Sequence, residues 1–196
     1  GILTNEPYRP SVMKKQYRML TPDRHKSEKL FKSLKCHPVV ADILVNRHIL
    51  TPEDAALFLS SDMKYLRPPV TIKDMDKAVL RIARALEKEE KILIFGDYDA
   101  DGVTATALFH DFFRRIGVDS AYYIPHRVKE GYGLDKEHIH RIAVPNGIDL
   151  IITVDCGSAS HEAVAAAKHA NIDVIITDHH QAAEPLPPAA AFVNPN

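Results

Sequence analysis

The chain has 196 residues, a formal net charge of −1 and a hydrophobic content of 45%, which is typical of one folded domain with a short extension. Its two cysteines are too few for a disulfide framework, and no apolar run approaches the roughly 18 residues that a membrane span needs. These features exclude a disulfide-rich secreted domain and a membrane protein, and they predict a cytoplasmic protein.

The first part of the chain is more basic than the rest. Residues 1–35 hold nine Lys and Arg against three Asp and Glu, a net charge of +6, which leaves −7 for residues 36–196. Such an arm fits either a nucleic-acid backbone or an ordinary solvated surface. Residues 1–33 show little periodicity, and we expect them to be loosely held.

A small helical segment and one amphipathic helix precede the main body of the fold. The apolar spacing between residues 34 and 59 predicts two short helices, the second of them capped by Thr51 with Pro52 in its first turn. The next helical pattern, over 74–90, has one apolar and one charged face. The predicted parts of the chain are an N-terminal extension, 1–73, and a domain, 74–196.

From residue 91 onwards, short apolar runs alternate with helical patterns. This alternation predicts βαβ units and hence an α/β fold, a parallel sheet with helices on both faces. The first helix of the series should bury a stripe formed by Leu108, Phe109, Phe112 and Ile116. The expected strands are 92–95, 121–124, 150–154 and 174–176, and the expected helices between them are 103–116, 135–143 and 160–169.

Polar residues follow the carboxyl ends of all four predicted strands. In an open parallel sheet these ends share one edge, and ligands bind in the crevice beside it. Side chains that are far apart in the sequence should therefore meet there. They are Asp97, Asp99 and Asp101 after the first strand, His126 and Arg127 after the second, Asp155 after the third, and His179 and His180 after the fourth.

Several of these residues also have a purely structural explanation. The three aspartates after the first strand match half of an EF-hand loop, but Leu108 stands where that loop needs Glu, and a strand precedes them. Asp101 alone could cap the following helix, Asp155 could be a turn residue, and Arg127 could pair with a carboxylate. The convergence of four strand ends favours a binding site over these separate explanations.

The two adjacent histidines need a separate consideration. Successive side chains of an extended segment point in opposite directions, so at most one of His179 and His180 should face the crevice. His179 is the predicted ligand because acidic residues are expected around it.

A divalent cation is the simplest partner for so many carboxylates. Oxygen ligands with one imidazole favour Mn²⁺ or Mg²⁺ over zinc, and Cys156 is expected to be a small buried residue rather than a ligand. More than three carboxylates suggest two ions bridged by a carboxylate and a water, which suits hydrolysis of a phosphoester or phosphoanhydride. Arg127 would then hold a phosphate with its planar guanidinium.

Four segments of the chain resemble the successive motifs of the DHH phosphoesterase superfamily, which is named for its Asp-His-His motif. Within it the likeness is to the RecJ family of single-strand-specific 5′→3′ DNA exonucleases, and it extends from about residue 34 to the end. The segments are GDYDADGVTATAL at 96–108, YYIPHRVKEGYGL at 122–134, ITVDCG at 152–157 and TDHH at 177–180.

The resemblance implies two metal ions, Mn²⁺ or Mg²⁺, and assigns their ligands. Asp99 and Asp101 would bind one ion each, Asp155 would bridge the two, and His179 would bind the second. The chain departs from the family at Phe95, where related enzymes often carry a histidine. The first ion is therefore expected to have fewer protein ligands and more water.

The resemblance also implies a substrate and a role in the cell. His180 would contact the scissile phosphate, Asp97 would support the metal ligands, and His126 and Arg127 would hold the backbone of single-stranded DNA. The implied activity is an exonuclease that releases mononucleotides in recombination and repair. A single-strand-binding protein and a helicase are the expected partners.

Two other functions fit the same residues. One is a phosphoesterase of the same chemistry that acts on pyrophosphate, small nucleotides or very short RNA, and the other is an inactive scaffold of the same fold that binds replication proteins. The family carries a further metal-binding aspartate, a DHHA1 domain and an OB-fold beyond the matching segment. We therefore expect this chain to be an N-terminal fragment with weak or absent nuclease activity.

Overall fold

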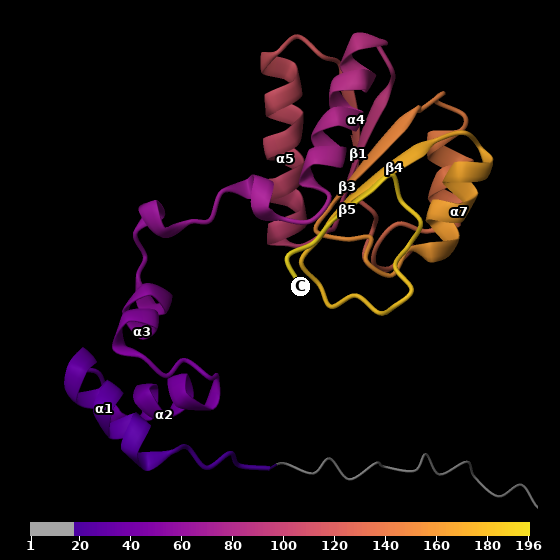
Figure 1. Ribbon diagram of the computed structural model, residues 1–196. Helices are drawn as coiled ribbons and strands as arrows, with labels where there is room; N and C mark the ends of the chain where they lie inside the picture. The colour runs from indigo at the N-terminus through magenta and orange to yellow at the C-terminus, as the bar shows by residue number, and fades with distance from the viewer. Residues whose placement is uncertain (1–17) are drawn as a thin grey trace, which may run out of the picture. The chain divides into compact units, whose positions relative to one another are not determined.

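The computed structural model describes residues 18–196 and divides the chain into two compact units, the first ending at Leu66 and the second beginning at Arg67 (Figure 1). The predicted boundary after residue 73 remains a prediction. No helix within the described range is long and apolar enough to cross a membrane. The elements of the first unit are α1 (Arg24–Leu34), α2 (Pro38–Asn46), α3 (Pro52–Leu59) and η1 (Met63–Tyr65).

The first unit has a small apolar core of its own. Thr51 caps α3 as predicted, because its hydroxyl accepts the backbone N–H of Asp54 at 3.1 Å. Helix α1 contradicts the expectation of a loosely held segment, at least for residues 24–33; residues 1–17 of that prediction lie outside the described range. The sequence of α1 lacks a clear apolar periodicity, because only Ser27 and Leu30 of this charged helix are buried.

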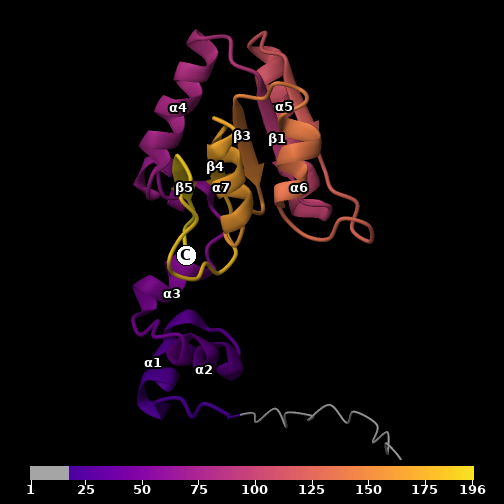
Figure 2. The ribbon, with the colours of Figure 1, turned by 90° about the vertical axis from the view of Figure 1, so that its right-hand side faces the viewer.

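The second unit is a five-stranded parallel sheet with the strand order β2-β1-β3-β4-β5. Every neighbouring pair is parallel, and helices lie on both faces (Figures 1 and 2). This arrangement confirms the predicted fold class. The strands are β1 (Ile92–Gly96), β2 (Ser120–Tyr123), β3 (Leu150–Val154), β4 (Asp173–Thr177) and β5 (Ala191–Val193).

The strands are buried on both faces because each side of the sheet has its own helical layer. Ile92 and Ile94 of β1 join the core beneath α4 and α5, whereas Leu93 and Phe95 join the core on the side of α7 (Figure 1). Continuous apolar runs are the expected sequence of such strands. The helical elements are η2 (Pro69–Thr71), α4 (Met75–Glu87), α5 (Ala100–Arg115), α6 (Lys136–His138), the π-helical turn η3 (Ile139–Ala143) and α7 (His161–His169).

Helix α5 begins earlier than predicted and buries a different face. Asp99 caps it by accepting the backbone N–H groups of Asp101 at 2.9 Å and Gly102 at 3.1 Å, so the cap is Asp99 and not Asp101. The predicted stripe is wrong, since two apolar stripes compete on this helix and packing selects the one that contains Phe113. Phe109 is partly buried against the core, while the exposed members of the predicted stripe are Leu108, Phe112 and Ile116.

Two elements in the second half of the chain also differ from the prediction. The helix expected over 135–143 is only a single α-helical turn, α6, followed by the π-helical turn η3. Strand β5 was not predicted, because it has three residues and follows a proline-rich segment. It pairs with β4 through Ile175 and Ala191, and therefore brings Asn194 to the edge of the sheet where the other strands end.

Candidate metal centre

The carboxyl ends of β1, β3 and β4 bring five of the predicted site residues together. Ligand atoms of Asp97, Asp99 and Asp155 lie within 4.8 Å of one another, and so do ligand atoms of Asp155, His179 and His180. Asp155 belongs to both groups, which is the position that a bridging carboxylate requires. We call these five residues the metal cluster.

Buried carboxylate oxygens without a hydrogen bond mark the centre of the metal cluster. Asp97 is 2% and Asp155 8% exposed, and within residues 18–196 no hydrogen bond reaches Asp97 Oδ1 or either carboxylate oxygen of Asp155. His179 Nε2 lies 3.0 Å from Asp155 Oδ1 but is not aligned to donate to it. Buried charged oxygens are unfavourable without a positive partner. A hard divalent cation such as Mn²⁺ or Mg²⁺ fits this set of oxygen and imidazole donors.

The surroundings of the metal cluster shift the pKa values of its carboxyl groups in different directions. Burial, and then the charge of Asp99, raise the pKa of Asp155, while His179 and His180 oppose this shift. The backbone N–H groups of Gly102 and Asp101 instead hold the pKa of Asp99 below its usual range. Without a cation, Asp155 is thus the carboxylate whose ionisation is disfavoured, a pattern that is common at functional sites.

The turn after β3 holds Asp155 in an unusual backbone conformation. Its N–H donates to Thr177 O at 3.0 Å, which extends the pairing with β4, but its φ of 61° is left-handed. Gly157, with a φ of 113°, completes the turn, and a Cβ at that position would lie 2.8 Å from Thr153 Oγ1. Strain of this kind at a non-glycine residue collects at functional sites.

Both histidines of the Asp-His-His segment belong to the metal cluster, so the expectation that at most one faces the crevice is wrong. Asp178 Oδ1 accepts the backbone N–H of His179 at 2.7 Å and that of His180 at 3.1 Å. These bonds form a turn immediately after β4, and the alternation of an extended strand does not apply there. The two imidazole rings consequently lie side by side, with centroids 4.6 Å apart.

A buried polar network fixes this turn to the neighbouring strands. Asp178 Oδ2 accepts the N–H of Ser158 at 3.0 Å, and Asn194 Nδ2 donates to Ser158 Oγ at 3.0 Å and to His180 O at 2.9 Å. Burial opposes ionisation of Asp178, but hydrogen bonds from Ser158 and His180 prevail and lower its pKa. The sequence analysis missed Ser158 and Asn194, although both follow the carboxyl end of a strand.

Replacing Asn194 with alanine should loosen this turn and destabilise the fold. The side chain is buried, and its removal leaves Ser158 Oγ and His180 O without their donor, so the free energy of unfolding should fall by about 1–3 kcal/mol. Urea unfolding measures this change. Asn146→Ala, which removes an exposed donor to Ile142 O, is the control with an expected change of about 0.5 kcal/mol or less. Equal stability of the two variants would contradict the prediction.

Three predicted site residues lie outside the metal cluster. Asp101 is exposed in the first turn of α5. The Arg127 guanidinium lies 5.3 Å from the centre of the Tyr98 ring, and His126 Nδ1 accepts a backbone N–H of its own loop at 3.2 Å. The metal-binding role of Asp101 and the DNA-binding roles of His126 and Arg127 therefore stay predictions.

Two neighbours of the metal cluster are core residues. Phe95 is fully buried, and its ring packs against Tyr123 and His138 with centroid distances of 5.8 and 4.9 Å. Cys156 is also fully buried, with its Sγ 3.7 Å from Phe95 O, and burial raises the pKa of its thiol. Cys156 is thus a small buried residue, as predicted, and Phe95 is a core residue of β1.

The loop after β2 adds one residue that the sequence analysis did not assign to the site. The hydroxyl of Tyr132 donates to Asp155 O at 3.1 Å and lies 3.1 Å from His180 Nδ1. Its ring meets the ring of His180 edge-on, with centroids 5.6 Å apart. The Gly-Tyr-Gly sequence in the second motif is the signal that could have indicated this residue.

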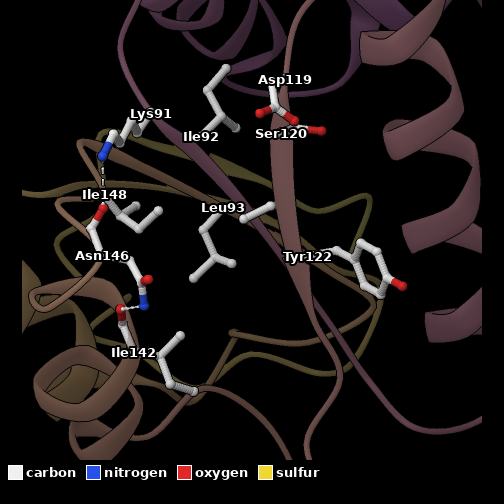
Figure 3. A pocket seen from close by; sticks show the side chains of 10 residues that line it. Lys91, Ile92, Leu93, Asp119, Ser120, Tyr122, Ile142, Asn146 and Ile148 are labelled. Carbon is white, nitrogen blue, oxygen red and sulfur yellow. Dashed lines mark hydrogen bonds between the residues drawn. The ribbon is translucent and has the colours of Figure 1, made fainter.

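A hollow at the amino-terminal ends of β1 and β2 is separate from the metal cluster (Figure 3). Lys91 Nζ donates to Asn146 O at 3.2 Å across it, and Asn146 Nδ2 donates to Ile142 O at 2.8 Å. No residue of the metal cluster lines this hollow. The two features therefore lie at opposite ends of the strands.

Comparison with known proteins agrees with this geometry. The chain is 41% identical over 182 residues to the single-stranded-DNA-specific exonuclease RecJ of Bacillus subtilis, covering 93% of this chain and 23% of that protein. It is 38% identical over 165 residues to RecJ of Haemophilus influenzae, covering 84% of this chain and 28% of the relative. The chain thus spans about a quarter of the length of these curated relatives.

Solved structures give the same result. A crystal structure of exonuclease RecJ bound to manganese superposes with a TM-score of 0.59 at 34% identity, over 66% of this chain and 33% of that one. RecJ from Thermus thermophilus in complex with Mn²⁺ gives a TM-score of 0.58 at 28% identity, over 89% of this chain and 24% of the other. Residues 91–196, which contain every strand and the whole metal cluster, match the DHH family, N-terminal domain. The chain therefore belongs to the DHH family.

Proposed function

We propose that this chain carries the metal centre of a 5′→3′ exonuclease that acts on single-stranded DNA. The observation that carries the proposal is the position of Asp155, which is shared by two groups of ligand atoms. Its two buried oxygens accept no hydrogen bond from any residue that the structure describes. Two ions on either side of one carboxylate are the arrangement used for in-line phosphodiester hydrolysis. The names of the relatives support single-stranded DNA as the substrate, and the 5′→3′ polarity is what the resemblance to the family implies.

The residues of the metal cluster divide into two sides around Asp155. Asp97 and Asp99 would hold one ion and His179 the other, with Asp155 between them. Bound ions would lower the pKa of a water and neutralise charge on the phosphate oxygens. Asp101, after β1, is proposed to bind the other ion when the site is loaded, because the family resemblance assigns one ion each to Asp99 and Asp101.

The remaining predicted residues are proposed to contact the substrate. His180 belongs to the metal cluster, and its Nδ1 already binds Asp178, so Nε2 is the nitrogen that can contact the scissile phosphate. Arg127, with His126 beside it, would hold the next stretch of DNA backbone, because a guanidinium suits bidentate phosphate contacts. The proposal places the protein in the cytoplasm, in recombination and repair, with a single-strand-binding protein and a helicase as partners.

Metal binding and hydrolysis test this function separately. Calorimetric titration with Mn²⁺ should show saturable binding of one or two ions. A 5′-phosphorylated single strand should then lose mononucleotides from its 5′ end, slowly, because the side chains of His179 and His180 are 59% and 47% exposed to solvent. Faster turnover of dinucleotides or pyrophosphate would favour the small-substrate alternative. Metal binding without any hydrolysis, both by this chain and by a chain of the full length of its relatives, would favour the scaffold.

His180→Gln separates the role of this histidine from metal binding. We expect hydrolysis to fall by at least about a hundredfold, because the phosphate contact is lost, while Mn²⁺ affinity stays within a factor of about three of the wild type. His140→Gln changes an exposed histidine outside the metal cluster and should leave both properties unchanged. Full activity of His180→Gln would remove this residue from the proposed mechanism.

A further inference from the structure

Tyr132 connects two parts of the metal centre that come from different strands. Its hydroxyl donates to the backbone carbonyl of Asp155, after β3, at 3.1 Å and lies 3.1 Å from Nδ1 of His180, after β4. Tyr132 itself comes from the loop after β2. One hydroxyl group therefore meets both the shared carboxylate residue and the histidine that is proposed to contact the phosphate.

The directions of these hydrogen bonds follow from the chemistry of the partners. The carboxylate of Asp178 can only accept, and its Oδ1 lies 2.8 Å from His180 Nδ1, so Nδ1 carries the proton. The hydroxyl of Tyr132 gives its own proton to the carbonyl of Asp155, and its oxygen faces the Nδ1–H. Nε2 of His180 is then left free to act on a substrate.

The loop that carries Tyr132 is held in place by a carboxylate. Glu130 accepts the hydroxyl of Tyr123 and the backbone N–H of His126, each at 2.7 Å. Gly131 and Gly133 flank Tyr132 with φ values of 84° and 82°. Residues that carry a side chain rarely adopt such φ values. The position of the Tyr132 hydroxyl is therefore set by the loop as well as by its two partners.

We propose that Tyr132 is a positioning residue, whose hydroxyl holds the imidazole of His180 and the strained backbone of Asp155 in the arrangement that hydrolysis requires. The effect on hydrolysis rests on the proposed function, whereas the orientation of His180 and Asp155 by Tyr132 does not depend on it. Partners of this kind, which orient a site residue through a hydrogen bond, typically contribute tenfold to a hundredfold to activity. Partial burial and the charge of Asp178 raise the pKa of Tyr132, so its hydroxyl remains a donor near neutral pH.

Tyr132→Phe tests the proposal by removing one oxygen and keeping the ring. Nitrogen NMR of the metal-free protein with labelled histidine, assigned with His180→Gln, reports the exchange of the His180 Nδ1–H with solvent. We expect this exchange to become about threefold faster in Tyr132→Phe, because the Nδ1–H loses the second of its two acceptors and keeps only the carboxylate of Asp178. Tyr122→Phe is the matched control, because Tyr122 lies on β2 and its side chain is exposed to solvent.

The outcomes separate this inference from the proposed function. Unchanged exchange of the His180 Nδ1–H in Tyr132→Phe would overturn the positioning role, whether or not the protein hydrolyses DNA. Faster exchange in a protein without phosphodiesterase activity would support the positioning role and reject the proposed function. With activity present, kcat should fall about tenfold to a hundredfold at an unchanged KM.

A second measurement needs no variant and guards against misfolding of Tyr132→Phe. In the wild-type protein the hydroxyl proton of Tyr132 should itself be protected from solvent exchange, since it is donated to Asp155 O. The exposed hydroxyl of Tyr122 should exchange rapidly. Equal, rapid exchange of both hydroxyl protons would contradict the proposal.

Discussion

Asp155→Asn should abolish metal binding. The substitution keeps the size of the side chain but removes the charge at the one position common to both groups of ligand atoms. Since even residues that only orient ligands contribute tenfold to a hundredfold, the loss of affinity for Mn²⁺ should exceed about a hundredfold. Calorimetry measures this loss directly, and wild-type affinity in the variant would show that the metal cluster is not the binding site.

The same substitution should stabilise the metal-free protein. The carboxylate of Asp155 is buried, and neither of its oxygens accepts a hydrogen bond from a donor within residues 18–196. Burial and the charge of Asp99 already disfavour its ionisation, so neutralising it should raise the free energy of unfolding by about 1–3 kcal/mol near pH 7. With free Mn²⁺ at about 100 times its Kd, the wild type should gain about 2.7 kcal/mol, whereas the variant should gain nothing. Stability and metal binding are therefore expected to change in opposite directions at this residue.

The pH dependence of stability independently tests whether Asp155→Asn stabilises the metal-free protein. Burial and the charge of Asp99 raise the pKa of Asp155 in the folded protein, so the folded state retains a proton that the unfolded state loses as the pH rises above about 4. The metal-free wild type should lose stability relative to Asp155→Asn through this range. If the free energies of unfolding of the wild type and Asp155→Asn differed by the same amount at all pH values, the raised pKa of Asp155 would be contradicted.

Gly102→Ala should strongly destabilise the fold, although Gly102 lies in a helix. In a helix, alanine is normally favoured over glycine by about 1 kcal/mol. Here a Cβ would lie 2.4 Å from Asp97 O and 2.6 Å from both Asp97 C and Asp97 N. Backbone atoms cannot rotate away as a side chain can, so relief requires α5 to move from the end of β1.

We expect the free energy of unfolding of Gly102→Ala to fall by at least about 2 kcal/mol, the net of overpacking and the gain in helix propensity. Mn²⁺ affinity should fall as well, because the shift displaces Asp97 and the cap residue Asp99. Val103→Ala, at the next and partly exposed position of the helix, is the control and should change stability by about 0.5 kcal/mol or less. An increase in stability for Gly102→Ala would contradict the close approach of α5 to Asp97.

Local patterns in the sequence determined the class of fold and where its site would lie. The apolar runs at 92–95 and 150–154 correspond closely to β1 and β3, because strands buried on both faces need continuous apolar sequences. The position of the metal cluster followed as well, since Asp97 and Asp155 come directly after parallel strands and His179 follows two residues after another. The periodicity of apolar residues is a property that neighbouring residues encode by themselves.

The tertiary structure decided which apolar face each helix buries and how the side chains of the site point. On α5 the stripes that contain Phe112 and Phe113 are both apolar, and contact with the sheet selects the latter. Strand β5 is too short to be recognised without the partner strand β4.

The orientations of His180 and Tyr132 likewise depend on residues distant in the sequence. Hydrogen bonds to Asp178 form the turn that brings both histidines close to Asp155. The loop after β2 places the hydroxyl of Tyr132 between Asp155 and His180. Such contacts join segments from three different strands, so their energies exist only once the sheet has formed. The sequence alone therefore determined the edge at which the site lies, and long-range hydrogen bonding determined the geometry of its residues.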